Sequence, residues 1–174
     1  MITIIVGTNR DQSKSRKIAE YYLTKLENLG EKAQILDLKD LPKDFVFSAL
    51  YANTGKHPEF NQFIKIINES EKYIFVVPEY NNSFPGVLKA FIDGLEFPGS
   101  FANKKAALVG LSSGVIGAAL ALSHLTDILN YLSMHVYAVK PRIPRISANF
   151  VDGVITDKFI ADLIDSQIKG FIKF

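Results

Sequence analysis

Short apolar runs alternate with amphipathic stretches along most of this chain. The run at residues 73–77 is continuously apolar and those at 1–6 and 106–111 are nearly so, which is typical of strands buried on both faces. Apolar residues at the 3.6-residue period predict helices, and these lie between residue 16 and Gly30 and at 59–70, 87–97, 116–132 and 157–172. Weaker patterns predict two more strands, at 33–38 and 134–139.

Regular alternation of buried strands and helices predicts an α/β fold. A parallel sheet covered by helices on both faces satisfies this pattern, and right-handed crossovers leave few ways to connect it. The 174 residues suit one domain that spans residues 1–174, with a long connection at 40–58.

The loop after the first strand carries donors suited to a phosphate group. Three hydroxyls and two guanidinium groups occur within nine residues, at Thr8, Arg10, Ser13, Ser15 and Arg16. A helix that begins here adds free N–H groups and the positive end of its dipole. The loop matches neither the Walker A pattern nor the three-glycine dinucleotide fingerprint. The alternative is an ordinary helix start capped by Ser13.

A second polar loop follows the strand at 73–77. It contains Pro78, which ends the strand because it cannot donate to a ladder, and then Glu79, Tyr80 and Asn81. Ligands of open α/β sheets bind at the carboxyl ends of strands. An aromatic face, an amide and several backbone N–H groups suit a flat heteroaromatic ligand, although a loop that merely caps the strand remains the alternative.

A third loop follows the strand at 106–111 and contains Ser112, Ser113 and Gly114. Small residues let a ligand approach the backbone closely and leave N–H groups free. Such turns are common, so the alternative is a turn in which a serine caps the next helix.

Composition excludes several classes of protein. The chain has no cysteine, which excludes disulfides and thiolate chemistry and favours a reducing compartment such as the cytoplasm. A net charge of +2 with scattered lysines does not indicate nucleic acid. No apolar stretch has the length of a membrane span, and the N-terminus has the pattern of a strand and not of a signal peptide. The three histidines have no metal-ligand spacing, so no metal site is expected.

Residues 7–16, 78–89 and 112–117, in this order and spacing, resemble the NADPH-dependent FMN reductase family. This flavodoxin-like group includes azo-, quinone- and chromate-reductase-type enzymes. The middle segment, Pro-Glu-Tyr-Asn-Asn-Ser-Phe-Pro-Gly, is the specific one, and the resemblance covers about residues 1–140. Departures from the family pattern are Ser15 for asparagine, Ala118 for glycine, Thr126 for arginine and Ser133 for glycine.

The resemblance implies a flavodoxin-like sheet of five parallel strands in the order 2-1-3-4-5, with the ligand between strands one and three. It implies FMN as cofactor, with its phosphate in the first loop and its ring over the second and third. NADPH or NADH then supplies hydride, and a small-molecule acceptor (a quinone, azo compound, metal oxyanion or flavin) takes it. The flavin carries this chemistry, so no side chain is expected to act as a strong acid or base.

Two alternatives stay open at this point. One is a module that holds FMN for electron transfer without using NAD(P)H, and the other is a regulator of the same fold that binds a nucleotide or phosphate. The helices at 87–97 and 116–132 carry wider apolar faces than one sheet needs, which together with the resemblance predicts a homodimer or homotetramer. The connection at 45–51 is expected to cover the neighbour's flavin.

Overall fold

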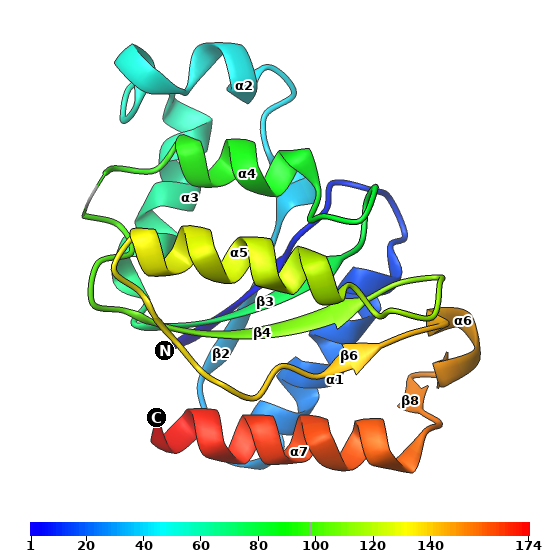
Figure 1. Cartoon of the computed structure of the whole chain (residues 1–174). Coiled ribbons are helices and arrows are strands. Elements are labelled where there is room, and N and C mark those ends of the chain that lie inside the picture. Colours follow the sequence, from blue (N-terminus) through cyan, green and yellow to red (C-terminus); the bar gives the residue numbers. More distant parts are fainter. Residues whose placement is uncertain (98) are drawn as a thin grey trace.

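The central sheet has the predicted parallel order, β2-β1-β3-β4-β5 (Figure 1). The structure is a computed structural model that describes residues 1–97 and 99–174. The five strands are β1 (Ile2–Val6), β2 (Ala33–Asp37), β3 (Lys72–Pro78), β4 (Lys105–Leu111) and β5 (His135–Val136). The three central strands are almost completely buried, as their continuous apolar runs predict.

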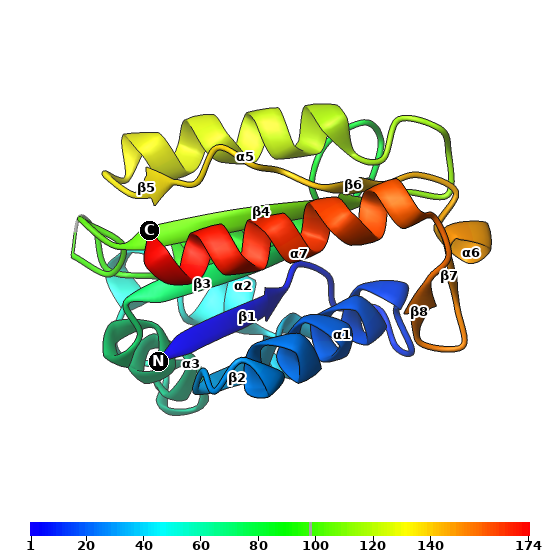
Figure 2. The same cartoon turned by 90° about the horizontal axis from the view of Figure 1, so that it is seen from below.

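Helices cover both faces of the sheet (Figure 2). One layer contains α1 (Lys14–Asn28) and α7 (Lys158–Lys173), and the other contains α3 (Pro58–Glu69), α4 (Gly86–Asp93) and α5 (Ala119–Tyr131). Each layer encloses its own apolar core against the sheet. The flavodoxin-like fold predicted from the sequence is therefore confirmed.

Polar caps set where several helices begin. Ser13 accepts a hydrogen bond from the amide of Arg16 at the start of α1, and Asp157 accepts one from Ile160 at the start of α7.

Two helices are shorter than predicted. The helix expected at 87–97 ends at Asp93, where Gly94 closes the last turn. The helix expected at 116–132 begins only at Ala119, because Ala118 has a left-handed backbone.

The edge strand differs most from its prediction. A strand was expected over 134–139, but β5 has two residues and pairing with β4 resumes only at β6 (Arg142–Ile143). Pro141 lies just before β6 and cannot donate an N–H to a ladder. The buried amide of Gln167 on α7 bonds the carbonyls of Leu108 and Val139, at 2.8 Å each, and so replaces ladder bonds across this gap.

Several short elements had no clear pattern in the sequence. The long connection at 40–58 contains α2 (Phe45–Ser48) and η2 (Tyr51–Asn53), preceded by η1 (Leu38–Asp40). After the edge strand come α6 (Ile146–Asn149) and a hairpin of β7 (Phe150–Val151) and β8 (Val154–Ile155). In the connection Phe45 is buried and stacks on Phe60, whereas Phe47 is 89% exposed.

Candidate functional site

The three polar loops meet at the carboxyl-terminal edge of the sheet, around a hollow of about 220 Å³. They follow β1, β3 and β4, which are neighbours in the sheet. Nine of the residues expected at the site line this hollow: Thr8, Arg10, Ser13, Ser15, Pro78, Glu79, Tyr80, Ser112 and Ser113. The lining does not include Arg16, Asn81 or Gly114.

The first loop leaves β1 at a point where a side chain would not fit. A Cβ on Gly7 would lie 2.9 Å from the carbonyl oxygen of Val76, to which the Gly7 amide also donates at 2.9 Å. The loop then turns into the N-terminus of α1. Thr8 and Ser15 are buried in the wall of the hollow, and Ser13 caps the helix. Hydroxyl groups and the positive end of α1 thus point to one place, which suits an anion.

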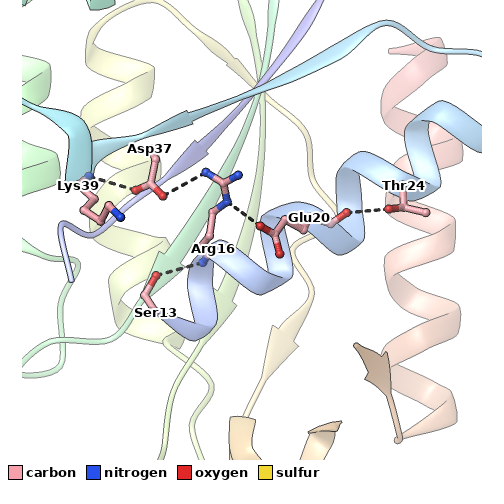
Figure 3. A network of polar contacts seen from close by, with 6 residues as sticks. All are labelled: Ser13, Arg16, Glu20, Thr24, Asp37 and Lys39. Atoms are coloured by element: carbon pink, nitrogen blue, oxygen red, sulfur yellow. Dashed lines mark hydrogen bonds and ion pairs between the residues drawn. The ribbon is translucent and has the colours of Figure 1, made fainter. Parts of the chain in front are cut away.

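The two arginines of this loop are separated. Arg10 lines the hollow, but the Arg16 side chain lies along the outside of α1 (Figure 3). Its Nε is 2.9 Å from Oε1 of Glu20, and its guanidinium is 3.4 Å from Oδ2 of the buried Asp37. The hydrogen bond to Glu20, together with the charges of Glu20 and Asp37, raises the pKa of Arg16 above its ordinary value.

The second loop is a tight turn with reciprocal backbone bonds. The Tyr80 amide donates to the Ser83 carbonyl at 2.8 Å, and the Ser83 amide donates back to Tyr80 at 3.0 Å. Asn81 and Asn82 occupy the two central positions with φ of 49° and 64°, which asparagine tolerates better than most residues. The Tyr80 hydroxyl is hydrogen-bonded to Oγ1 of Thr8 at 2.7 Å, so its phenol ring bridges the first and second loops.

The third loop is held by its own first serine. The Ser112 hydroxyl donates to the Gly114 carbonyl and accepts from the Gly117 amide, at 3.0 Å each. Because α5 begins at Ala119, Ser112 shapes the loop and does not cap the helix. Gly114 is turned toward the later chain, where its carbonyl accepts from the Arg145 amide at 2.8 Å.

Five lining residues were not predicted: Asp11, Gln12, Lys14, Leu111 and Ile146. The first three belong to the expected loop, and Lys14 could have been found from its charge. Ile146 could not, since it lies in α6, beyond the recognisable motifs. It reaches the hollow because its amide donates to the Ser112 carbonyl at 2.9 Å.

The described residues contain neither a metal-binding cluster nor a membrane-spanning helix. Within residues 1–97 and 99–174, no group of three acidic, histidine or cysteine side chains is arranged to hold a metal ion. Over the same residues, every helix is too short or too polar to cross a bilayer. What the hollow offers is hydroxyls, cations and backbone amides beside an aromatic side chain, a donor set that fits a phosphate joined to a flat ring.

Known proteins have sequences related to this chain. Residues 1–141 match the family model of NADPH-dependent FMN reductases. A 2-hydroxy-1,4-benzoquinone reductase of Burkholderia sp. is 32% identical over 76% of this chain and 72% of its own length. An NAD(P)H-dependent FMN reductase of Pseudomonas aeruginosa is 33% identical over 81% of this chain and 77% of its own.

A solved structure agrees with the sequence relatives. The flavoenzyme NAD(P)H:(acceptor) oxidoreductase FerB of Paracoccus denitrificans superposes with a TM-score of 0.77 at 26% identity, covering 99% of this chain and 94% of that one. Fold, motifs and relatives coincide, and they favour an enzyme over a module without NAD(P)H activity. The chain belongs to the NADPH-dependent FMN reductase family and is an FMN-dependent NAD(P)H oxidoreductase.

Proposed function

We propose that the hollow at the carboxyl-terminal edge holds FMN, and that the acceptor of the hydride is a quinone. The observation that carries the proposal is the convergence of the loops after β1, β3 and β4 on one polar hollow. A ligand there contacts the N-terminus of α1 together with the second loop, which carries Tyr80, and the small-residue third loop. FMN suits this arrangement, with a phosphate at one end and a flat ring at the other.

The first loop holds the phosphate in this proposal. Thr8, Ser13 and Ser15 supply hydroxyl donors, and the amides at the start of α1 supply backbone donors. Arg10 supplies the guanidinium, whose fork matches phosphate oxygens. Arg16 keeps a role through its backbone alone, because its side chain is held by Glu20 and Asp37.

The second and third loops hold the ring. Pro78, Glu79 and Tyr80 of the second loop line the hollow, and so do Ser112 and Ser113 of the third. Bound FMN supplies hydride chemistry, accepting a hydride from NAD(P)H and donating it to the acceptor. The chain's part is to align the ring and shield it, which agrees with a lining that has no histidine or cysteine.

A quinone acceptor is favoured by the relatives, of which one is named a benzoquinone reductase. The test is anaerobic mixing of FMN-loaded protein with NADPH or NADH, followed by 1,4-benzoquinone. We expect the visible flavin bands to bleach with the nicotinamide and to return with the quinone. Protein that develops no bound-flavin spectrum with added FMN contradicts the proposal, and flavin that NAD(P)H cannot bleach contradicts the enzymatic part.

Assembly belongs to the same proposal. Phe97 and Tyr131 are 68% and 76% exposed, and their rings stack 6.1 Å apart beside an apolar hollow of about 430 Å³ between α4 and α5. Exposed aromatic surface of this kind is typical of subunit contacts. We propose that a second copy covers this face in a homodimer, or in a homotetramer built from such dimers.

Light scattering tests the assembly. The FMN-loaded protein is expected to have at least twice the 19.4 kDa mass of one chain. Tyr131→Asp places a charge in the proposed contact and should lower that mass at micromolar concentration, whereas Phe159→Asp, at a 74% exposed position on α7 in the other helix layer, serves as the matched control. A single-chain mass for the unaltered protein contradicts the assembly but not the flavin site.

A further inference from the structure

Glu79 joins the two loops on either side of the proposed ring position. Its Oε2 accepts a hydrogen bond from the amide of Ala118, at 3.1 Å. Its own amide donates to the carbonyl of Leu111, at 3.0 Å, so the residue is attached both to the end of β4 and to the segment that follows it. Glu79 is also one of the residues that line the hollow. Glu79 thus ties the second loop to the third at the site itself.

The group that Glu79 bonds has a strained backbone. Ala118 has φ 66° and ψ 28°, in the left-handed region, and it follows Gly117 with φ 67°. A non-glycine residue in this region costs about 1 kcal/mol or more and persists only where its surroundings hold it. Two side chains hold this turn, since Ser112 Oγ accepts from the Gly117 amide and Glu79 accepts from the next amide along the chain.

The negative charge of Glu79 acts on a redox ligand separately from the hydrogen bond to Ala118. Glu79 is the single ionic side chain in the second and third loops, residues 78–85 and 112–118. The other ionic residues that line the hollow, Arg10, Asp11 and Lys14, belong to the first loop. A ring between the second and third loops therefore has a carboxylate as its charged neighbour. Reduction by two electrons and one proton leaves the ring with one more negative charge, which a nearby carboxylate disfavours.

We propose that Glu79 is a positioning residue that holds the strained Gly117–Ala118 turn and lowers the reduction potential of bound FMN through its charge. The inference rests on the proposed function and extends it, because it assigns a role to one side chain. A lower potential makes the reduced flavin a stronger hydride donor to the acceptor. The hydrogen bond and the charge are two separable contributions, and different substitutions remove them.

Glu79→Gln separates the charge from the bond, since the amide oxygen can still accept from Ala118. We expect it to leave the affinity for oxidised FMN unchanged and to strengthen binding of reduced FMN about tenfold. This ratio corresponds to a rise of about 30 mV in the midpoint potential of the two-electron couple. The measurement is equilibration of FMN-loaded protein with a reference dye under anaerobic conditions. Glu27→Gln, the same change at the far end of α1, is the matched control.

Glu79→Ala removes both the charge and the bond. It should show the same rise in potential and, in addition, weaker binding of oxidised FMN, measured by quenching of flavin fluorescence. Ala118→Gly added to Glu79→Ala relieves the strained turn, so it should restore the affinity while leaving the potential raised.

The outcomes separate this inference from the proposed function. Failure of the unaltered protein to bind FMN overturns the function. Normal FMN binding by Glu79→Gln, with a potential within about 10 mV of the unaltered protein, overturns the role of the charge, because that corresponds to a change of only about twofold. Equal FMN affinity in Glu79→Ala and the unaltered protein overturns the positioning role.

Discussion

The helix ends at the two edges of the central sheet have different surroundings: lysine side chains at one edge and an open hollow at the other. At the amino-terminal edge, lysines cap helix C-termini from within the chain. Lys72 Nζ donates to the carbonyls of Phe171 and Ile172 at the end of α7, at 3.2 and 2.7 Å. Lys104 Nζ donates to the carbonyls of Ile67 and Asn68 in the last turn of α3, at 2.9 and 3.1 Å. These cations satisfy carbonyls that the helices leave unpaired, at the negative ends of their dipoles.

The carboxyl-terminal edge keeps its donors available. There the N-terminus of α1 faces the hollow beside Thr8 and Ser15. Arg10 also lines the hollow. The second and third loops, which contain turns with a left-handed backbone, contribute to the same lining. The difference shows where the fold is built for stability and where it is built for a ligand. The amino-terminal edge satisfies the ends of α3 and α7 with lysine side chains. At the carboxyl-terminal edge Ser13 caps one amide of α1, and we propose that the first turn of this helix also binds the phosphate of FMN.

The largest expected effect comes from breaking the internal capping. Lys104→Met removes a charged donor from the end of α3 and from the hydroxyl of Tyr73, 3.2 Å away. We expect the free energy of unfolding to fall by about 1.5–3 kcal/mol, the range for hydrogen bonds that involve a charged group. FMN affinity should not change, because the residue lies at the opposite edge from the hollow. Urea unfolding and fluorescence titration measure the two quantities.

A surface lysine provides the control for that comparison. Lys43→Met makes the same chemical change at an exposed position and should alter the free energy of unfolding by less than about 0.5 kcal/mol. Equal stability of the Lys104 and Lys43 variants would show that the capping bonds contribute nothing. A loss of FMN affinity in the Lys104 variant would show that the two edges are not independent.

Arg10→Ala should have the converse effect of Lys104→Met: lower FMN affinity with the stability of the fold nearly unchanged. Losing a charge-assisted contact to phosphate is expected to weaken FMN binding by about 1.5–3 kcal/mol, or ten- to a hundredfold, with little change in stability. Riboflavin, which lacks the phosphate, should bind the variant and the unaltered protein equally. Lys17→Ala, a cation on α1 outside the hollow, is the matched variant. If riboflavin and FMN lose affinity alike, Arg10 does not contact the phosphate.

Tyr80→Phe should have a smaller effect, since it removes one neutral hydrogen bond, between the Tyr80 hydroxyl and Thr8. A bond of this kind contributes about 0.5–1.5 kcal/mol, so we expect a modest fall in unfolding free energy and a severalfold weaker FMN complex. Tyr131→Phe, on a tyrosine that is 76% exposed at the end of α5 and keeps its ring in the variant, controls for the loss of a hydroxyl. Unchanged values for both variants would mean that the first and second loops are positioned independently.

The sequence predicted the central part of the fold well because buried parallel strands have an unmistakable pattern. Continuous apolar runs located β1, β3 and β4, and strand order followed from alternation and the family resemblance. The edge strand was predicted poorly. Its interruption depends on Gln167, 28 residues beyond Val139 in the chain, and a contact of that range leaves no trace in local periodicity.

The candidate site, like the fold, was predicted well in one respect and poorly in another. The three loops meet at one hollow, as expected, because they directly follow three neighbouring buried strands. The direction of individual side chains could not be predicted. Arg10 and Arg16 look equivalent in sequence, yet one lines the hollow and the other is turned away by two carboxylates. Asp37 lies at the end of β2, and only the parallel pairing of β2 with β1 brings it beside α1.

The smallest expected effect tests that difference directly. Arg16→Ala removes a partly exposed ion-pair network, whose contribution to stability should be at most about 1 kcal/mol because such pairs are screened by solvent. FMN affinity should fall less than threefold, since the backbone amide of residue 16 still bonds the capping hydroxyl of Ser13. The comparison with Arg10→Ala, by fluorescence titration at low and high salt, is decisive. A tenfold or greater loss of FMN affinity in the Arg16 variant would show that its side chain leaves Glu20 and Asp37 to bind the phosphate.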